Sequence, residues 1–214
     1  MPVLRYVALG DSLTEGVGDP VRGRLRGWAA LLGAALAAAS PGSVVTNFGR
    51  RGATVAAVRA EQVPLSLPLL PDLVTLVVGV NDVTTPGAFT PGRFAADLDA
   101  CVAPFWAAGS RVVLARLHDP VARLPLPPRV AAGVRDRVAA LNAAVGVVAA
   151  RHGALVVDLG AAPEVHADAT WSLDRLHPAE AGHRALAAAV ADLLRSDGVA
   201  VAPVALHPLP GEEG

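Results

Sequence analysis

The sequence predicts a single α/β domain in which helices cover both faces of a parallel sheet. Five short apolar runs alternate with longer segments rich in Ala and Leu. The short runs are nearly continuous in apolar residues rather than alternating, as expected of strands that are buried on both faces. A β-α pair that repeats five times builds a parallel sheet with helices on both sides.

Each element can be assigned in chain order. The predicted strands occupy residues 3–9, 43–47, 72–78, 111–117 and 154–159. The predicted helices follow them in turn, at residues 25–39, 54–62, 91–108, 128–152 and 178–195. Two Pro-rich stretches, 64–71 and 120–128, are too short to separate domains. We therefore expect one domain over residues 1–196 and a Pro-rich, partly mobile tail over residues 197–214.

Composition excludes several classes of protein. The chain has 214 residues, 53% of them hydrophobic and 17% charged, which is incompatible with a disordered chain. All 18 basic residues are Arg, so neither a Schiff-base lysine nor a lysine-containing phosphate loop is available. A formal net charge of −1 gives no indication of a nucleic-acid partner. The single cysteine, Cys101, excludes an internal disulfide and a cysteine-based zinc cluster.

The N-terminus does not have the layout of a signal peptide, because its apolar stretch is short and contains Arg5. The longest smooth apolar run, residues 28–39, is shorter than the ~18 residues that span a bilayer. We expect a cytoplasmic protein with no stable membrane insertion. Nothing in the sequence indicates its oligomeric state.

Polar and glycine residues collect directly after each predicted strand. These clusters are residues 10–16, 47–52, 79–82, 118–120 and 174–178. In an open parallel sheet, ligands bind beyond the carboxyl ends of the strands. The sequence therefore predicts a functional site at this edge of the sheet.

The clusters contain the parts of an acyl-transfer site. Ser12 is predicted at the start of a helix. Asp174 and His177 are three residues apart, just before Pro178, which suits the first position of a helix. Such a turn can place the carboxylate against one imidazole nitrogen and leave the other for a serine hydroxyl, as in a Ser-His-Asp triad.

Three donors are available for an oxyanion. They are the backbone N–H of Ser12, the unobstructed backbone N–H of Gly52 and the side-chain amide of Asn81.

These clusters do not form the G-x-S-x-G elbow of α/β-hydrolases, because Thr14 stands in place of the second glycine. They resemble instead the four blocks of the SGNH (GDSL-type) hydrolase family, in the family's order, over residues 3–195. The matching blocks are Gly10-Asp11-Ser12-Leu13, Gly52 within an Asn-x-Gly-x-x-Gly loop, Gly79-x-Asn81-Asp82 and Asp174-x-x-His177-Pro178.

The resemblance implies a flavodoxin-like, three-layer α/β/α sandwich with a five-stranded parallel sheet of order 2-1-3-4-5. It also implies ester hydrolysis without a metal or other cofactor. The family's functional positions correspond to Ser12 as nucleophile, His177 as base, Asp174 as orienting acid, and Ser12, Gly52 and Asn81 as oxyanion donors. Gly52 matches the functional glycine better than Gly49 does.

Simpler interpretations exist for the same residues. Ser12 is also a good helix N-cap, and Asp174 is also a good loop-capping residue. We expect Asp11 and Asp82 to brace the loops that hold Ser12 and Asn81.

His118, Trp171 and Arg51 are the predicted substrate-binding residues. His118 and Asp119 could alternatively form a metal site with His166 and Asp168, but no tight ligand spacing supports one, so we expect no metal. Arg50 and Arg51 could be solvated loop charges or a clamp for an anionic substrate. His152, His183 and His207 are expected at the surface.

The function that follows is a serine esterase acting on small, soluble carboxylic esters, with short acyl chains favoured because no long insertion suggests a lid. Activity is expected to fall on the acid side as His177 becomes protonated. The alternatives are a carbohydrate O-deacetylase or an acyl-thioesterase using the same site, and a non-catalytic binding module on the same fold.

Overall fold

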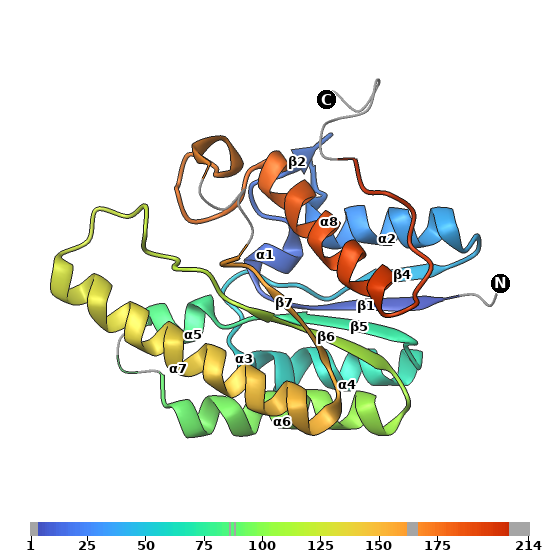
Figure 1. Ribbon diagram of the computed structural model, residues 1–214, viewed down its shortest axis with the longest axis horizontal. Coiled ribbons are helices and arrows are strands. Elements are labelled where there is room, and N and C mark those ends of the chain that lie inside the picture. The colour runs from blue at the N-terminus through green and yellow to red at the C-terminus, as the bar shows by residue number, and fades with distance from the viewer. Residues whose placement is uncertain (1–3, 86, 88, 162–166, 206–214) are drawn as a thin grey trace.

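Five parallel strands form the central sheet of the computed structural model, which describes residues 4–85, 87, 89–161 and 167–205 (Figure 1). The strands are β1 (Arg5–Gly10), β4 (Val44–Asn47), β5 (Leu73–Val77), β6 (Arg111–Arg116) and β7 (Leu155–Asp158). They lie side by side in the order β4-β1-β5-β6-β7. Numbered along the chain, these five strands have the order 2-1-3-4-5, which confirms the predicted topology.

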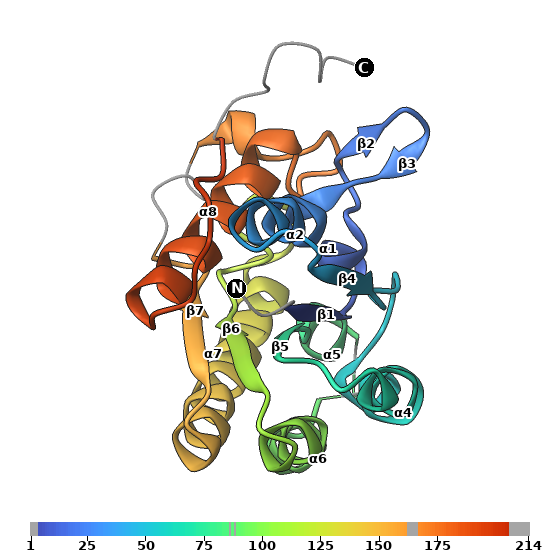
Figure 2. The same cartoon turned by 90° about the vertical axis from the view of Figure 1, so that its right-hand side faces the viewer.

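Helices cover both faces of this sheet, so the predicted three layers are confirmed (Figure 2). One face carries α1 (Ser12–Glu15), α2 (Gly27–Ala39) and α8 (Glu180–Ser196). The other carries α3 (Val55–Ala57), α4 (Val63–Ser66), α6 (Pro91–Ala107) and α7 (Pro128–His152). The core between the layers consists mainly of Val, Leu and Ala side chains and includes Cys101 and Trp28, both fully buried.

Strand β1 is central and sets the position of the site. Tyr6 is opposite Val45 of β4 on one side and Leu73 of β5 on the other. Gly10, the last residue of β1, is opposite Val77, the last residue of β5, so both strands end at the same edge. The loops that follow them therefore begin next to each other.

The helix predicted over residues 54–62 extends further. After α3 it continues through the π-helical turn η1 (Val58–Gln62), then α4 and the 3-10 turn η2 (Leu67–Leu69). Pro64 and Pro68 do not end it, because each lies in the first turn of a new helical segment, where proline is tolerated.

Four short elements were not predicted: the hairpin of β2 (Pro20–Val21) and β3 (Arg24–Leu25), the helix α5 (Val80–Thr84) and the turn η4 (Asp168–Thr170). The hairpin turns at Arg22 and Gly23, which both have positive φ, the backbone form that suits a two-residue hairpin. The prediction that the last helix begins at Pro178 is wrong. It begins at Glu180, because Pro178 pairs with Trp171 in an antiparallel bridge.

Candidate active site

The turn that follows β1 presents Ser12. Asp11 caps α1 by accepting a hydrogen bond on Oδ1 from the backbone N–H of Leu13, at 3.0 Å. Ser12 is the first residue of α1, so its own N–H has no partner within the helix. Gly10 has a φ of +152°, and a Cβ there would lie 2.1 Å from the carbonyl oxygen of Val77, so only glycine fits this position.

Ser12, His177 and Asp174 form one hydrogen-bonded chain. The Nε2 atom of His177 lies 2.9 Å from Ser12 Oγ, and its Nδ1 atom lies 2.6 Å from Asp174 Oδ2. Ser12 and His177 are separated by 165 residues in the sequence, so the fold alone brings them together. The three predicted residues thus have the connectivity that general-base activation of a serine requires.

The loop from Ser172 to His177 holds Asp174 as an acceptor. Its Oδ1 accepts hydrogen bonds from the Ser172 hydroxyl at 2.7 Å and from the backbone N–H groups of Leu176 and His177, both at 2.9 Å. Burial alone would raise the pKa of Asp174, but these bonds and the His177 ring together lower it well below its usual range. The carboxylate therefore stays ionised opposite the imidazole.

The loop after β4 contains two glycines with different surroundings. The N–H of Gly49 already donates to Asn47 Oδ1 at 2.8 Å, and a Cβ on Gly49 would lie 2.5 Å from the backbone nitrogen of Glu15. Gly52 has a φ of +78°, and a Cβ at this position would meet no atom within 4 Å. Its backbone N–H has no hydrogen-bond partner among the described residues. Of the two glycines, Gly52 is therefore the one whose backbone N–H is available to a ligand.

Asn81, after β5, joins its loop to the Gly52 loop. Its Nδ2 donates to the carbonyl oxygen of Ala53 at 3.0 Å, which leaves the second hydrogen of the amide for another acceptor. Next to it, both carboxylate oxygens of Asp82 accept from the N–H of Val55, at 3.1 and 3.3 Å. The predicted bracing role of Asp82 matches these contacts.

Two buried carboxyl groups lie behind the site. Burial raises the pKa of Asp11 to about 7 against the opposing hydrogen bond from Leu13, and the Asp82 carboxylate adds a smaller upward shift. Burial likewise raises the pKa of Asp82 to about 6. Both groups brace backbone N–H groups and are buried away from solvent.

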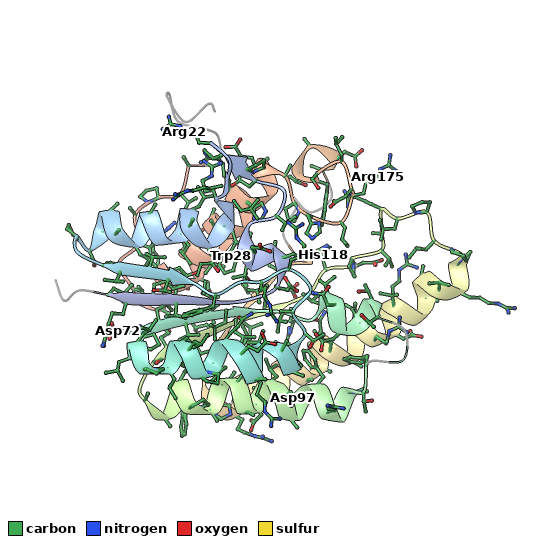
Figure 3. All side chains as sticks on the ribbon, turned by 180° about the vertical axis from the view of Figure 1, so that it is seen from behind. Arg22, Trp28, Asp72, Asp97, His118 and Arg175 are labelled. Carbon is green, nitrogen blue, oxygen red and sulfur yellow. The ribbon has the colours of Figure 1, made fainter. Side chains whose placement is uncertain are left out.

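His118 and Trp171 lie together at the same edge of the sheet, with ring centroids 4.9 Å apart. Figure 3 shows His118 beyond the ends of the strands and Asp72 at the opposite edge. Burial, only partly offset by Asp119, lowers the pKa of His118 to about 4, so the ring is neutral. Its Nε2 atom is buried and has no hydrogen-bond partner among the described residues. The guanidinium of Arg123 lies 5.1 Å from the centre of the Trp171 ring.

A pocket of about 50 Å³ adjoins these two rings. Its walls are almost entirely apolar and include Leu13, which follows Ser12, and Pro178, which follows His177. The remaining walls come from β7 and the residue after it, from η4 and from α8, at Val157, Asp158, Leu159, Thr170, Gly182, Ala185, Leu186 and Ala189.

Arg50 and Arg51 are exposed on the loop that carries Gly52. Arg50 forms an ion pair with Glu61 at 2.6 Å. The backbone N–H of Arg51 donates to Glu15 at 2.8 Å, whereas its guanidinium lies 3.9 Å from the same carboxylate.

The prediction that His183 lies at the surface is wrong, and His152 is partly buried. His183 is fully buried: its Nδ1 accepts from the N–H of Trp28 at 3.2 Å, and its Nε2 donates to the carbonyl oxygen of Val17 at 2.9 Å. Burial lowers the pKa of His183, which keeps it neutral and able to accept from Trp28. The His152 side chain is 8% exposed and contacts Asp99. His207 lies outside the described residues.

No group of three or more His, Cys, Asp and Glu side chains suited to a metal occurs in the described part of the chain. His166, which we considered as a metal ligand, lies outside that part, and Asp168 pairs with Arg123 at 3.5 Å. The helices of the described residues include none long and apolar enough to cross a membrane.

The sequence matches the model of the GDSL-like Lipase/Acylhydrolase family over residues 8–185. No curated protein matches it.

Several solved structures share the fold. LAE5, an alpha/beta hydrolase enzyme from the metagenome of Lake Arreo, Spain, is 27% identical, with a TM-score of 0.72 over 89% of this chain and 94% of that one. The lipase/acylhydrolase from Enterococcus faecalis is 23% identical, with a TM-score of 0.71 over 92% and 96%. Axe2, an acetylxylan esterase from Geobacillus stearothermophilus, is 24% identical, with a TM-score of 0.70 over 89% and 94%.

Proposed function

The chain belongs to the GDSL-like lipase/acylhydrolase family and is a carboxylic ester hydrolase, and we propose that it works by two-step acyl transfer through Ser12. Ser12 Oγ attacks the ester carbonyl while its proton passes to His177 Nε2. Asp174 fixes the ring with Nδ1–H directed at its carboxylate and stabilises the imidazolium that forms.

The tetrahedral oxyanion accepts hydrogen bonds from the N–H groups of Ser12 and Gly52 and from the Asn81 amide. His177 then donates its proton to the departing alkoxide, which leaves an acyl-serine. Water attacks this ester, its proton passes through His177 back to Ser12 Oγ, and the carboxylic acid is released.

The single observation that carries the proposal is the pair of contacts at His177. One ring nitrogen lies 2.9 Å from Ser12 Oγ and the other 2.6 Å from Asp174. Asp11, not Ser12, caps α1, so the helix itself does not need the Ser12 hydroxyl. If Asp174 were only a loop cap, nothing would require a histidine between it and Ser12. The N–H of Gly52, which has no partner in the part of the chain that the structure describes, further supports an oxyanion site rather than a closed turn.

The apolar pocket beside His118 and Trp171 supports a short acyl group as the preferred substrate. The pocket has a volume of about 50 Å³ and almost entirely apolar walls, so it suits a small apolar group better than a long acyl chain. We assign His118 and Trp171 to the apolar end of the substrate. Arg51, whose side chain is 66% exposed next to Gly52, is assigned to its polar end.

Hydrolysis of p-nitrophenyl esters from acetate to dodecanoate, by the parent and by Ser12→Ala at mildly alkaline pH, tests the proposal. We expect the parent to turn over the short esters fastest and Ser12→Ala to be inactive, with both proteins melting cooperatively. Equal activity of the two proteins would rule out Ser12 as the nucleophile. If both are inactive here and on acetylated-sugar and thioester substrates, the site is a binding module and the proposal fails.

A further inference from the structure

The side-chain amide of Gln62 takes the place of a neighbouring strand at the end of β1, next to Ser12. Strand β4 ends at Asn47, opposite Ala8, but β1 continues for two more residues to Gly10. The following residues still donate to β1, from Phe48 N–H to the Ala8 carbonyl and from Arg50 N–H to the Gly10 carbonyl. The N–H of Gly10, however, donates to a side chain.

That side chain is Gln62. Gly10 N–H donates to Gln62 Oε1 at 2.9 Å, and Gln62 Nε2 donates back to the Gly10 carbonyl oxygen at 2.8 Å. A primary amide presents its acceptor oxygen and one of its N–H donors on the same side, so it can pair with both the N–H and the carbonyl of a single residue. Gln62 thus takes the place of a neighbouring strand opposite Gly10, where the chain after β4 turns away to form the Gly52 loop.

The turn η1 places this amide inside the molecule. Val58 and Gln62 are the buried residues of η1, and Gln62 is only 5% exposed. The intervening Arg59 and Glu61 face outward and pair with Asp97 and Arg50. Widened π-helical turns inside helices are often associated with functional sites.

We infer that Gln62 is a positioning residue for the acyl-transfer site, an inference that rests on the proposed function. Gly10 is separated from Ser12 only by Asp11, and its carbonyl also receives the N–H of Arg50, two residues before Gly52. One amide therefore fixes the peptide from which both the Ser12 turn and the Gly52 loop extend. Gln62 touches neither substrate nor reacting atoms.

Replacing Gln62 by Met keeps its length and removes both hydrogen bonds. Because a displacement of about 1 Å in a catalytic group can cost on the order of 10²-fold in rate, we expect kcat for p-nitrophenyl acetate to fall roughly 10- to 100-fold in Gln62→Met. KM should change far less, because the substrate-binding walls are elsewhere.

Gln62→Glu supplies a readout that a purely structural role does not predict. An ionised Glu still accepts from Gly10 N–H but cannot donate to the Gly10 carbonyl, whereas a protonated Glu can do both. The kcat of Gln62→Glu relative to the parent should therefore rise as pH falls from mildly alkaline to mildly acidic. This variant also gives an answer if Gln62→Met does not fold.

Ser66→Ala is the matched control. Ser66 is fully buried one turn further along the same helical segment, and its hydroxyl donates to the carbonyl oxygen of Val63, not to the site. We expect Ser66→Ala to lower the melting temperature with kcat unchanged. The inference is overturned if Gln62→Met loses no more kcat than Ser66→Ala, or if the relative kcat of Gln62→Glu is independent of pH.

Ser12→Ala, assayed alongside, distinguishes failure of the proposed function from failure of the positioning role of Gln62. If Ser12→Ala is as active as the parent, the proposed function itself is wrong. If Ser12→Ala is inactive and Gln62→Met behaves like Ser66→Ala, the proposed function stands and only the positioning role of Gln62 is wrong.

Discussion

The site has two halves, which are held in place differently. The serine half comprises residues 10–12, 49–53 and 79–82, and hydrogen bonds between distant residues hold it. These bonds join Gln62 to Gly10, Asn47 to Thr14, Asn81 to Ala53 and Asp82 to Val55, across 52, 33, 28 and 27 residues. The histidine half, residues 172–177, is held mainly by bonds to Asp174 from residues two or three positions away.

The serine half is also more deeply buried than the histidine half. Asp11 and Asp82 in the serine half are buried, whereas the Asp174 side chain is 50% exposed and Leu173 next to it is fully exposed. A half built from long-range buried contacts should lose stability whenever it loses activity. A half built from local exposed contacts should lose activity alone.

The largest effect is expected in the histidine half, for Asp174→Asn. The amide cannot hold the imidazole in the required tautomer, so kcat should fall by about 10⁴-fold. The melting temperature should hardly change, because the loop is exposed. Steady-state kinetics and thermal denaturation check both results. Ser172→Ala, which removes one hydrogen bond to Asp174, is the control and should cost far less activity. A large loss of stability in Asp174→Asn would break the contrast between the halves.

Asn81→Ala is the corresponding change in the serine half. Loss of one oxyanion donor should lower kcat by about 10²–10³-fold. The carbonyl of Ala53 also loses its donor, so the free energy of unfolding should fall by roughly 1 kcal/mol. Thr84→Ala, on the same short helix, removes only a bond to Val80 and should retain full kcat. Unchanged kcat in Asn81→Ala would remove Asn81 from the oxyanion site.

The two glycines of the β4 loop distinguish packing from donor function. Gly49→Ala places a Cβ against the backbone of Glu15 and should destabilise the protein by about 1–3 kcal/mol. Gly52→Ala meets no atom and should cost only about 1–2 kcal/mol, from its left-handed backbone. Denaturant titration measures both. Relative to its loss of stability, Gly52→Ala should lose more activity than Gly49→Ala. The reverse order would favour Gly49 as the oxyanion donor.

Asp11→Asn tests the pH dependence of the serine half. Because the pKa of Asp11 is raised to about 7 in the folded state, from about 4 in an unfolded chain, the folded state binds more protons between these values. The stability this group contributes is fully present below about pH 4 and is lost as pH rises through about 7. Asp11→Asn should therefore be more stable relative to the parent at pH 8 than at pH 5, as measured by urea denaturation. A pH-independent difference would contradict the raised pKa.

The smallest effect is expected for Leu173→Ser. Leu173 is fully exposed, so the free energy of unfolding should change by less than about 0.5 kcal/mol and kcat for acetate esters should be unaltered. A selective loss on long esters would instead place Leu173 against the substrate and make the histidine half part of the binding surface.

This contrast also explains what the sequence could predict. The histidine half is local, so Asp174 and His177, three residues apart, suggest their own contact. The edge of the sheet was predictable because polar clusters follow every strand. The role of Gln62 could not be predicted. Its contact with Gly10 depends on the widened turn η1, and no periodic pattern of apolar residues in the sequence marks a π-helical turn. The burial of His183 could not be predicted, because its two backbone partners, Trp28 on α2 and Val17 in the turn after α1, lie more than 150 residues away in the sequence.

The hairpin at Arg22 was missed for a different reason. Its strands have two residues each, too few for any alternation to be visible, and its turn carries Arg rather than Asn or Asp before Gly23. The predicted helix ends at Gln62, whereas the structure continues it through Pro64, which lies in the first turn of α4, where proline is tolerated.

The most direct test of the central claim is to identify the residue that becomes covalently modified. The protein would be treated with an activated alkyl phosphonate ester, digested and analysed by mass spectrometry. If Ser12 is the nucleophile and His177 its base, one adduct per chain is expected, on Ser12, and it should form much more slowly in His177→Ala. Inactivation with the adduct on another residue, or at the same rate in His177→Ala, would contradict this assignment.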